Sequence, residues 1–320
     1  MLKKFSLRKI SLTTAALFAT ALIYILPSTT PKLEVKEKLE YVSSETNLND
    51  IFLLDKNSYV ALTKVVLSET QIENKAKELL NILTVGGEDA KIPSGFSAIL
   101  PPDTKILSLT YDNGLIKVDF SKDLLEVNKK REEKMIEAIV YTLTSIDDVN
   151  KVIIYVEGDI LTKLPKTKEN LPSTLDRTFG INKEYDFEKV SNIKDVTIYY
   201  VSQYGNKNYY VPVTKYLNDD REKIEIIIDQ LTTSFNYNKN LMSYLNEETK
   251  LVSNNIKDNI MDLDFNEYIF DDITEKEILE EVIYTICLSA KDNYDIKEIV
   301  LKSENKEICK ANSKINTCKK

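Results

Sequence analysis

The sequence contains no histidine and no tryptophan, and it has only 7 glycines, 8 prolines and 3 cysteines in 320 residues. Without histidine, Ser-His-Asp triads and histidine-ligated zinc or iron sites are excluded. Little glycine and proline, with 42% hydrophobic and 29% charged residues, is typical of a folded globular protein rather than a fibrous or disordered one. The length favours about two domains.

The cysteines all lie near the C-terminus, as Cys287, Cys309 and Cys318, and no CxxC pair occurs. An odd number of cysteines in a long chain does not indicate a disulfide framework. Two interpretations remain open. Either Cys309 and Cys318 form a disulfide in an oxidising compartment, or all three are unpaired thiols.

Negative charge predominates, with a formal net charge of -8, but it is unevenly distributed. Residues 1–31 carry four basic side chains and no acidic one, which leaves 39 basic and 51 acidic side chains in residues 32–320. The net charge of this body is therefore -12. Because an acidic body repels phosphate backbones, we expect no nucleic-acid partner.

An uncharged, largely apolar run follows these four basic residues, at positions 10–26. About 20 apolar residues span a bilayer as a helix, and a basic flank stays on the cytoplasmic side. Residues 1–31 are therefore predicted to be a signal anchor or a cleaved signal peptide. Small residues at 19–21 offer a cleavage site, but the bulky residues at 22–26 favour an uncleaved, single-pass anchor. Membrane contact is expected through residues 10–26, with the rest of the chain outside the cytoplasm.

The remainder of the chain reads as a diverged tandem repeat. Residues 32–48 are charged and are predicted to form a stalk, and residues 159–194, with two prolines and many charges, a linker. The first domain is then expected at 49–158 and the second, more diverged domain at 195–305. Residues 306–320 are expected to form a polar tail.

Each half shows the same order of strand and helix patterns. Apolar strand segments around a short turn predict a β-hairpin, and apolar residues at helical spacing then predict an amphipathic helix. Two more strands, a second helix and a last strand follow by the same patterns. In the first half Asn113-Gly114 separates two apolar runs, which is a strong hairpin signal. The apolar positions of the second helix, between Met135 and Leu143, recur 143 residues later. Each half is therefore predicted to be β-β-α-β-β-α-β.

This order predicts an α/β (α+β) fold class with two tandem two-layer units. In each unit the helices are expected to pack on one face of a mixed sheet. The apolar membrane segment precedes both units.

Five segments of the first half occur in an order that resembles the GerMN domain of sporulation and spore germination proteins. They are 92–95 (IPSG), 105–109 (KILSL), 118–122 (VDFSK), 138–144 (AIVYTLT) and 151–158 (KVIIYVEG). The second half keeps the Leu-Asp-Phe step at 263–265 and the Tyr-Thr step at 284–285, but lacks the Pro-Gly stretch. The positions that carry the resemblance are Pro93, Gly95, Asp119, Ser121, Tyr141, Thr142, Glu157, Gly158, Asp264, Tyr284 and Thr285.

The resemblance implies a non-enzymatic extracytoplasmic protein of sporulation or germination, with domains that act as assembly or scaffold modules between mother cell and forespore. Its motif positions are then structural, with no catalytic residue, cofactor or metal site. The partners implied are other envelope and sporulation proteins, with self-association as a further expectation. Typical members are lipoproteins, whereas no cysteine lies near the end of the apolar run here. A transmembrane anchor is therefore favoured over lipid attachment.

Two other functions are compatible with the residues. A peptidoglycan-binding module would stack sugars on exposed tyrosines, and a cell-wall hydrolase would use paired carboxylates. The candidate carboxylates are Glu157 and Asp159, which flank Gly158. The candidate tyrosines lie at positions 199, 200, 204, 209, 210 and 216.

Overall fold

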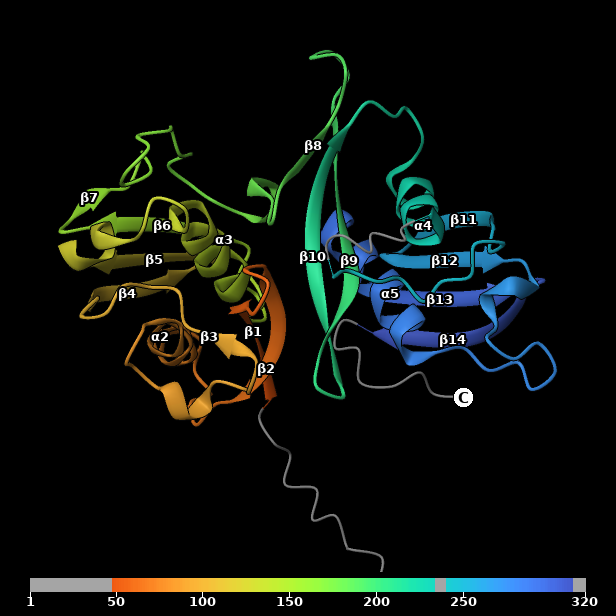
Figure 1. Cartoon of the computed structure of the whole chain (residues 1–320), viewed down its shortest axis with the longest axis horizontal. Coiled ribbons are helices and arrows are strands. Elements are labelled where there is room, and N and C mark those ends of the chain that lie inside the picture. The colour runs from red at the N-terminus through yellow and green to blue at the C-terminus, as the bar shows by residue number, and fades with distance from the viewer. Residues whose placement is uncertain (1–47, 234–239, 313–320) are drawn as a thin grey trace, which may run out of the picture. The chain divides into compact units, whose positions relative to one another are not determined.

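The computed structural model describes residues 48–233 and 240–312 (Figure 1). The expected membrane segment, and the expected stalk apart from Leu48, lie outside the described residues. Among the described helices, none is long and apolar enough to cross a membrane. The two repeats belong to one compact unit, and each has a hydrophobic core of its own.

The first repeat follows the predicted order of strands and helices, with short 3-10 turns and small strands added. Its elements are β1 (Leu48–Asp55), β2 (Val60–Val66), α2 (Ile72–Leu83), η1 (Asp89–Lys91), β3 (Phe96–Ser97), β4 (Ile106–Asp112), β5 (Leu115–Phe120), η2 (Lys122–Glu126), α3 (Glu132–Leu143), β6 (Lys151–Val156), β7 (Asp159–Ile160) and η3 (Arg177–Phe179).

The second repeat has the same succession. Its elements are β8 (Glu184–Asp186), β9 (Lys194–Tyr204), β10 (Lys207–Leu217), α4 (Lys223–Thr233), β11 (Leu251–Lys257), β12 (Ile260–Phe265), η5 (Glu267–Ile269), α5 (Glu280–Asn293), β13 (Glu298–Ser303) and β14 (Lys306–Asn312).

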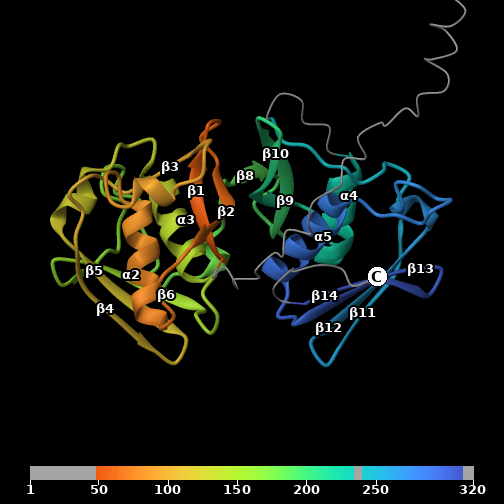
Figure 2. The same ribbon diagram turned by 90° about the horizontal axis from the view of Figure 1, so that it is seen from below.

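In both repeats the helices lie between two sheets, not on one face of a single sheet as the sequence predicts (Figure 1, Figure 2). One layer is a four-stranded sheet, β4-β5-β6-β7 or β11-β12-β13-β14, in which only the second and third strands are parallel. The opposite layer is the first hairpin of the repeat. Helix α3 contacts β1 and β6, and thus both layers. The fold is mixed α+β, but each repeat has three layers.

The first hairpin is not part of the four-stranded sheet, and its first strand is buried on both faces. Residues 51–55 of β1 are all buried, which is the pattern of a strand covered on two sides. Helix α3 contacts this hairpin within the repeat, and the β9–β10 hairpin of the second repeat joins it through the pair Leu62–Tyr210. Ala61 belongs to the second core and Tyr199 to the first. The repeats therefore share a central sheet.

The segment expected to be a linker, residues 159–194, is part of this packing. Its residues Leu164, Leu171, Leu175 and Ile181 are buried in the first core, and β8 pairs in parallel with β10. Apolar side chains at these positions stabilise a packed segment rather than a free connection.

The C-terminal segment also differs from the expected polar tail. Residues 306–312 form β14, which pairs antiparallel with β13 and buries Cys309 and Ala311. Cys309 is disulfide-bonded, so the interpretation with three unpaired thiols is wrong. Cys287 is a buried free thiol, and Cys318, the expected partner of Cys309, lies outside the described residues.

Asn182 connects the two hairpins at the centre of the shared sheet. Its Nδ2 donates to the carbonyl oxygens of Val60 and Pro212, both at 2.8 Å, and its Oδ1 accepts from the Val60 amide at 3.0 Å. Three backbone groups from two repeats thus depend on one buried amide side chain.

Replacing Asn182 with alanine is expected to lower the free energy of unfolding by about 2 kcal/mol, because buried backbone groups lose their partners. Chemical denaturation measures this change. Asn192→Ala is the matched control, since Asn192 also has a positive φ but is exposed. Equal losses in the two variants would show that backbone strain, and not the buried hydrogen bonds, causes the effect.

Candidate interaction sites at the sheet edges

Each four-stranded sheet begins with an edge strand that carries the same irregularity. Strand β4 has a β-bulge between Ile106 and Ser108, and strand β11 has one between Leu251 and Ser253. The extra residue is Leu107 in the first repeat and Val252 in the second. Both repeats therefore present one bulged apolar residue at the outer edge of the sheet.

These bulged residues are unusually exposed for large apolar side chains. Leu107 is 50% exposed and Val252 64% exposed, and Ile256 on the same strand as Val252 is 45% exposed. Edge strands offer unpaired backbone groups to another chain, and bulges and charges commonly protect them. Here each bulge instead coincides with an exposed apolar side chain on an edge strand.

The aspartates of Val118-Asp119-Phe120 and Leu263-Asp264-Phe265 stabilise a hairpin turn in each repeat. Asp119 accepts from the Gly158 amide at 3.2 Å, and Asp264 accepts from the Asn305 amide at 3.0 Å. Both turns have two consecutive residues with positive φ, Glu157-Gly158 and Glu304-Asn305. Asn305 adopts this backbone as glycine does, so the second repeat keeps the turn although its sequence departs from the motif.

Several other motif residues bind neighbouring backbone groups. The Ser121 hydroxyl accepts from the Lys105 amide at 3.0 Å, and the Glu157 carboxylate accepts from the Lys122 amide at 3.0 Å. Together they tie the end of β5 to β4 and to the turn after β6. The carbonyl oxygen of Pro93 accepts from the Phe96 amide at 3.2 Å, which closes a turn around Gly95.

Gly95 lies where the first repeat meets the tip of the β9–β10 hairpin. It has a φ of +94°, and a Cβ atom there would lie 2.5 Å from Cγ of Tyr204. No other residue fits without moving that ring, so this position requires glycine for contact between the repeats.

Tyr141 and Thr142 lie inside the first core, where Thr142 accepts from the Phe52 amide at 3.0 Å. The corresponding bond in the second repeat joins the Tyr199 amide to Ser289 at 2.8 Å. Ser289, and not Thr285, is therefore the counterpart of Thr142.

The Tyr-Thr step of the second repeat thus lies one helical turn earlier than in the first. Thr285 is buried and donates to the Glu281 carbonyl. Tyr284 stacks on Tyr210, with ring centroids 5.2 Å apart and an interplanar angle of 6°.

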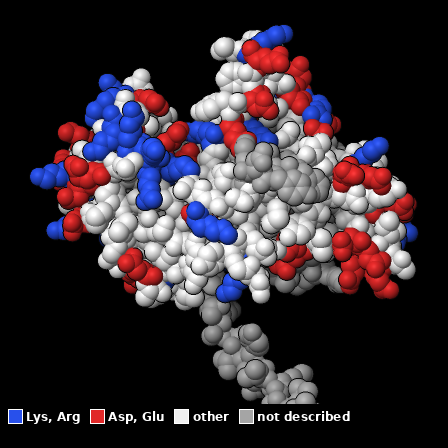
Figure 3. Space-filling view, in the orientation of Figure 1, with Lys and Arg blue, Asp and Glu red and all other residues white. Residues whose placement is uncertain are grey.

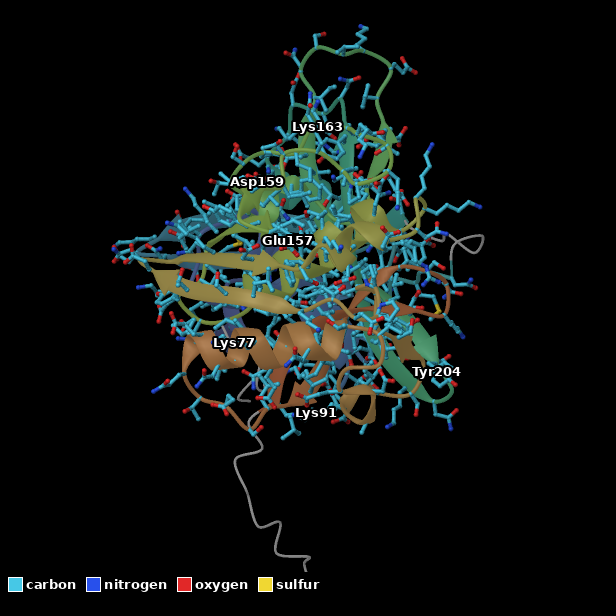
Figure 4. All side chains as sticks on the ribbon, turned by 90° about the vertical axis from the view of Figure 1, so that its left-hand side faces the viewer. Lys77, Lys91, Glu157, Asp159, Lys163 and Tyr204 are labelled. Atoms are coloured by element: carbon cyan, nitrogen blue, oxygen red, sulfur yellow. The ribbon has the colours of Figure 1, made fainter. Side chains whose placement is uncertain are left out.

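The features expected of a glycan or hydrolase site are dispersed. Of the six tyrosines singled out, only Tyr204 is more than one-third exposed, at 42%, and its ring covers Gly95. Glu157 and Asp159 are exposed beside each other at a hairpin turn, far along the structure from Tyr204 (Figure 4). Neither carboxylate lines the pocket at the start of α3 or the one beside residues 243–247.

Comparison with known proteins places this geometry in a family. The family described as sporulation and spore germination (Germane) matches residues 41–162 and 197–309. Spore germination protein GerM of Bacillus subtilis (strain 168) is 32% identical over 270 residues, covering 82% of this chain and 73% of that protein.

A solved structure shares the arrangement of both repeats. The tandem GerMN domains of the sporulation protein GerM from Bacillus subtilis match with a TM-score of 0.75 and 31% identity, over 81% of this chain and 91% of that one. The match covers both repeats of the described chain. The protein therefore belongs to the sporulation and spore germination family and carries two tandem GerMN domains.

Proposed function

We propose that this protein is a non-enzymatic, extracytoplasmic scaffold that assembles with other envelope proteins between mother cell and forespore. The observation that carries the proposal is the bulged apolar residue at the outer edge of both sheets, Leu107 and Val252. Two similar edges on one chain allow it to contact two neighbours, which is what a module in a larger assembly needs.

The relatives support the biological setting of the proposal. They are described as a spore germination protein and a sporulation protein. Membrane attachment through residues 10–26, with the repeats outside the cytoplasm, remains part of the proposal and rests on the apolar run and its basic flank.

Site-specific photo-crosslinking in sporulating cells tests the docking edges. A crosslinker at position 107 or 252 is expected to capture envelope proteins or a second copy of this chain. A crosslinker at the exposed Lys77 of α2 (Figure 4) serves as the control. Equal capture at all three positions would contradict docking through the edges.

A double variant tests whether the edges matter for function. Leu107→Asp with Val252→Asp is expected to lower sporulation efficiency by about tenfold or more, because a charge buried in an apolar contact costs several kcal/mol. Both side chains are exposed, so the thermal unfolding midpoint of the variant should stay close to that of the parent. Normal sporulation by a folded variant would overturn the proposal.

Peptidoglycan binding receives no specific support from the burial of the tyrosines. Sedimentation with insoluble cell wall distinguishes the two functions, since a scaffold without glycan affinity stays in the supernatant.

A further inference from the structure

An open pocket of about 500 Å³ lies in the first repeat, where the turn between β1 and β2 meets the start of α3. Half of the residues that line it carry positive charge, and none carries a carboxylate. The lining residues are Leu54, Ser58, Asn128, Lys130, Arg131 and Lys134. Its size lies within the range of small-ligand sites, roughly 300–1,000 Å³.

Lys134 is held in place at the wall of this pocket. Its Nζ donates to the Ser58 carbonyl and lies 5.7 Å from the centre of the Tyr59 ring. Burial lowers the pKa of Lys134, while the carboxylates of Glu137, Asp55 and Glu133 act in the opposite direction. The ammonium group is therefore positioned before any ligand arrives.

Lys130 and Arg131 stand at the exposed rim of the pocket. Asn128 fixes their backbone, since its side-chain oxygen accepts from the Lys130 amide at 2.9 Å and its carbonyl from the Arg131 amide at 2.8 Å. Within the part of the chain that the structure describes, neither side chain takes part in an identified ion pair.

The acidic residues at the start of α3 have hydrogen-bond or ion-pair partners that do not line the pocket. The Glu132 carboxylate accepts from the backbone amides of Lys166 and Thr167 at 2.6 and 3.0 Å. Glu133 pairs with Lys183 at 2.8 Å. The rim charges are thus not neutralised by the carboxylates next to them in sequence.

The positive charge of the pocket lining contrasts with the net negative charge of the protein. Lysines and arginines gather over the first repeat in Figure 3, although the body of the protein is acidic. Arginine and lysine side chains, with hydroxyl and amide donors nearby, are the groups that bind phosphate oxygens.

We propose that this pocket binds a phosphate group, presented either by a lipid headgroup or as free phosphate. Lys130 and Arg131 supply charge-assisted hydrogen bonds from the rim, and Ser58 and Asn128 add neutral donors. The assignment is independent of the docking edges, because the pocket lies at a different part of the first repeat.

Titration of the full chain with inorganic phosphate and with short-chain phosphatidylglycerol below its micelle concentration tests the proposal. Isothermal calorimetry should show saturable binding of at least one probe. In Lys130→Gln with Arg131→Gln, affinity should fall by about tenfold or more, since the variant loses the charge-assisted hydrogen bonds that both side chains supply. Both side chains are exposed, so folding should be unaffected.

The control variant, Lys77→Gln with Lys117→Gln, removes the same charge from exposed positions on α2 and β5. Its affinity should stay within about twofold of the parent protein, because a specific site depends on positioned groups and not on net charge. Tighter binding of the phosphatidylglycerol identifies a lipid headgroup, and tighter binding of inorganic phosphate identifies a free phosphate. Absence of saturable binding, or equal weakening in the control, would overturn the proposal.

Discussion

Replacing Asp292 with alanine is expected to lower the free energy of unfolding by about 3–5 kcal/mol, because the variant leaves a guanidinium group without its counter-charge inside the protein. Asp292 lies on α5, and its carboxylate pairs with Arg177 of η3 while accepting from the Tyr199 hydroxyl at 2.8 Å. Its side chain is only 6% exposed. The pair links the segment after the first repeat to the last helix of the second.

The Arg177 side chain is 26% exposed, and the rest of it contacts several groups besides Asp292. Its Nε donates to Thr144 at 3.1 Å, and its guanidinium lies 4.9 Å from the ring centre of Tyr141 and 5.7 Å from that of Phe52. Removing the Asp292 carboxylate leaves the positive charge of the Arg177 guanidinium without its partner. The place of the lost carboxylate is poorly accessible to water, because the Asp292 side chain is only 6% exposed.

A double-mutant cycle separates the pair from simple loss of packing. Arg177→Met and Asp292→Leu should each destabilise the protein in urea, whereas the double variant should recover most of the loss, as apolar replacements of buried ion pairs often do. Tyr199→Phe, which removes a single hydroxyl donor, serves as the control and should cost about 1 kcal/mol. Additive losses in the double variant would show that the two charges do not depend on each other.

Local elements could be predicted from the sequence where pattern and turn chemistry agree. Asn113-Gly114 does form the turn between β4 and β5, with positive φ at both residues. The parallel pairing of β5 with β6 around α3 follows from the strand-helix-strand order. These features depend on neighbours in the chain.

The register of the last helix illustrates where periodicity fails. Matching Met135 with Ile278 aligns apolar residues, but the hydrogen bonds match Thr142 with Ser289, which is 147 residues later instead of 143. A shift of four residues moves a helix by about one turn and keeps the same face toward the core. Apolar spacing alone therefore cannot distinguish the two alignments.

The shared central sheet depends on contacts far apart in the chain. An uninterrupted apolar run such as 51–54 is typical of a strand covered on both faces, but the hairpin predicted from it did not include the second covering layer. Arg177 and Asn182 lie in a segment whose prolines and charges suggested a linker. The sequence feature that indicates packing of this segment against the first core is its apolar residues, Leu164, Leu171 and Leu175.

A sequence pattern also indicates the bulges of the edge strands. Ile106-Leu107 and Leu251-Val252 each place two apolar residues in succession where an exposed edge strand should alternate. A bulge explains such a pair, since the extra residue leaves the alternation of the strand. The phosphate pocket had no comparable signal, because Lys130 and Arg131 meet Ser58 only through the fold.

As the pH is raised from about 4.5 to 7, the free energy of unfolding of the parent protein is expected to fall relative to that of the Glu137→Gln variant. Glu137 is only 2% exposed, and burial raises the pKa of its carboxyl from 4.5 to about 7, although the Asn182 amide donates to it at 3.1 Å. A carboxyl with a raised pKa in the folded protein favours folding while protonated. Its contribution is complete below pH 4.5 and is lost as the pH rises through 7.

The size of the effect follows from the difference between a pKa of 4.5 in the unfolded chain and one of about 7 in the folded protein, which corresponds to a free energy on the order of 3 kcal/mol. Glutamine stays neutral at every pH and keeps a side-chain oxygen that accepts from the backbone amide of Asn182. The difference in unfolding free energy between variant and parent should therefore grow from pH 4.5 to 8 in favour of the variant.

Urea denaturation at several pH values measures this difference, with Glu225→Gln as the control because Glu225 is an exposed carboxylate on α4. The control should follow the pH profile of the parent. A parallel profile for Glu137→Gln would mean that Glu137 is already ionised in the folded protein at pH 5, with Lys134 or Lys183 compensating its charge. In that case the variant should be less stable than the parent at pH 8, which is the opposite sign.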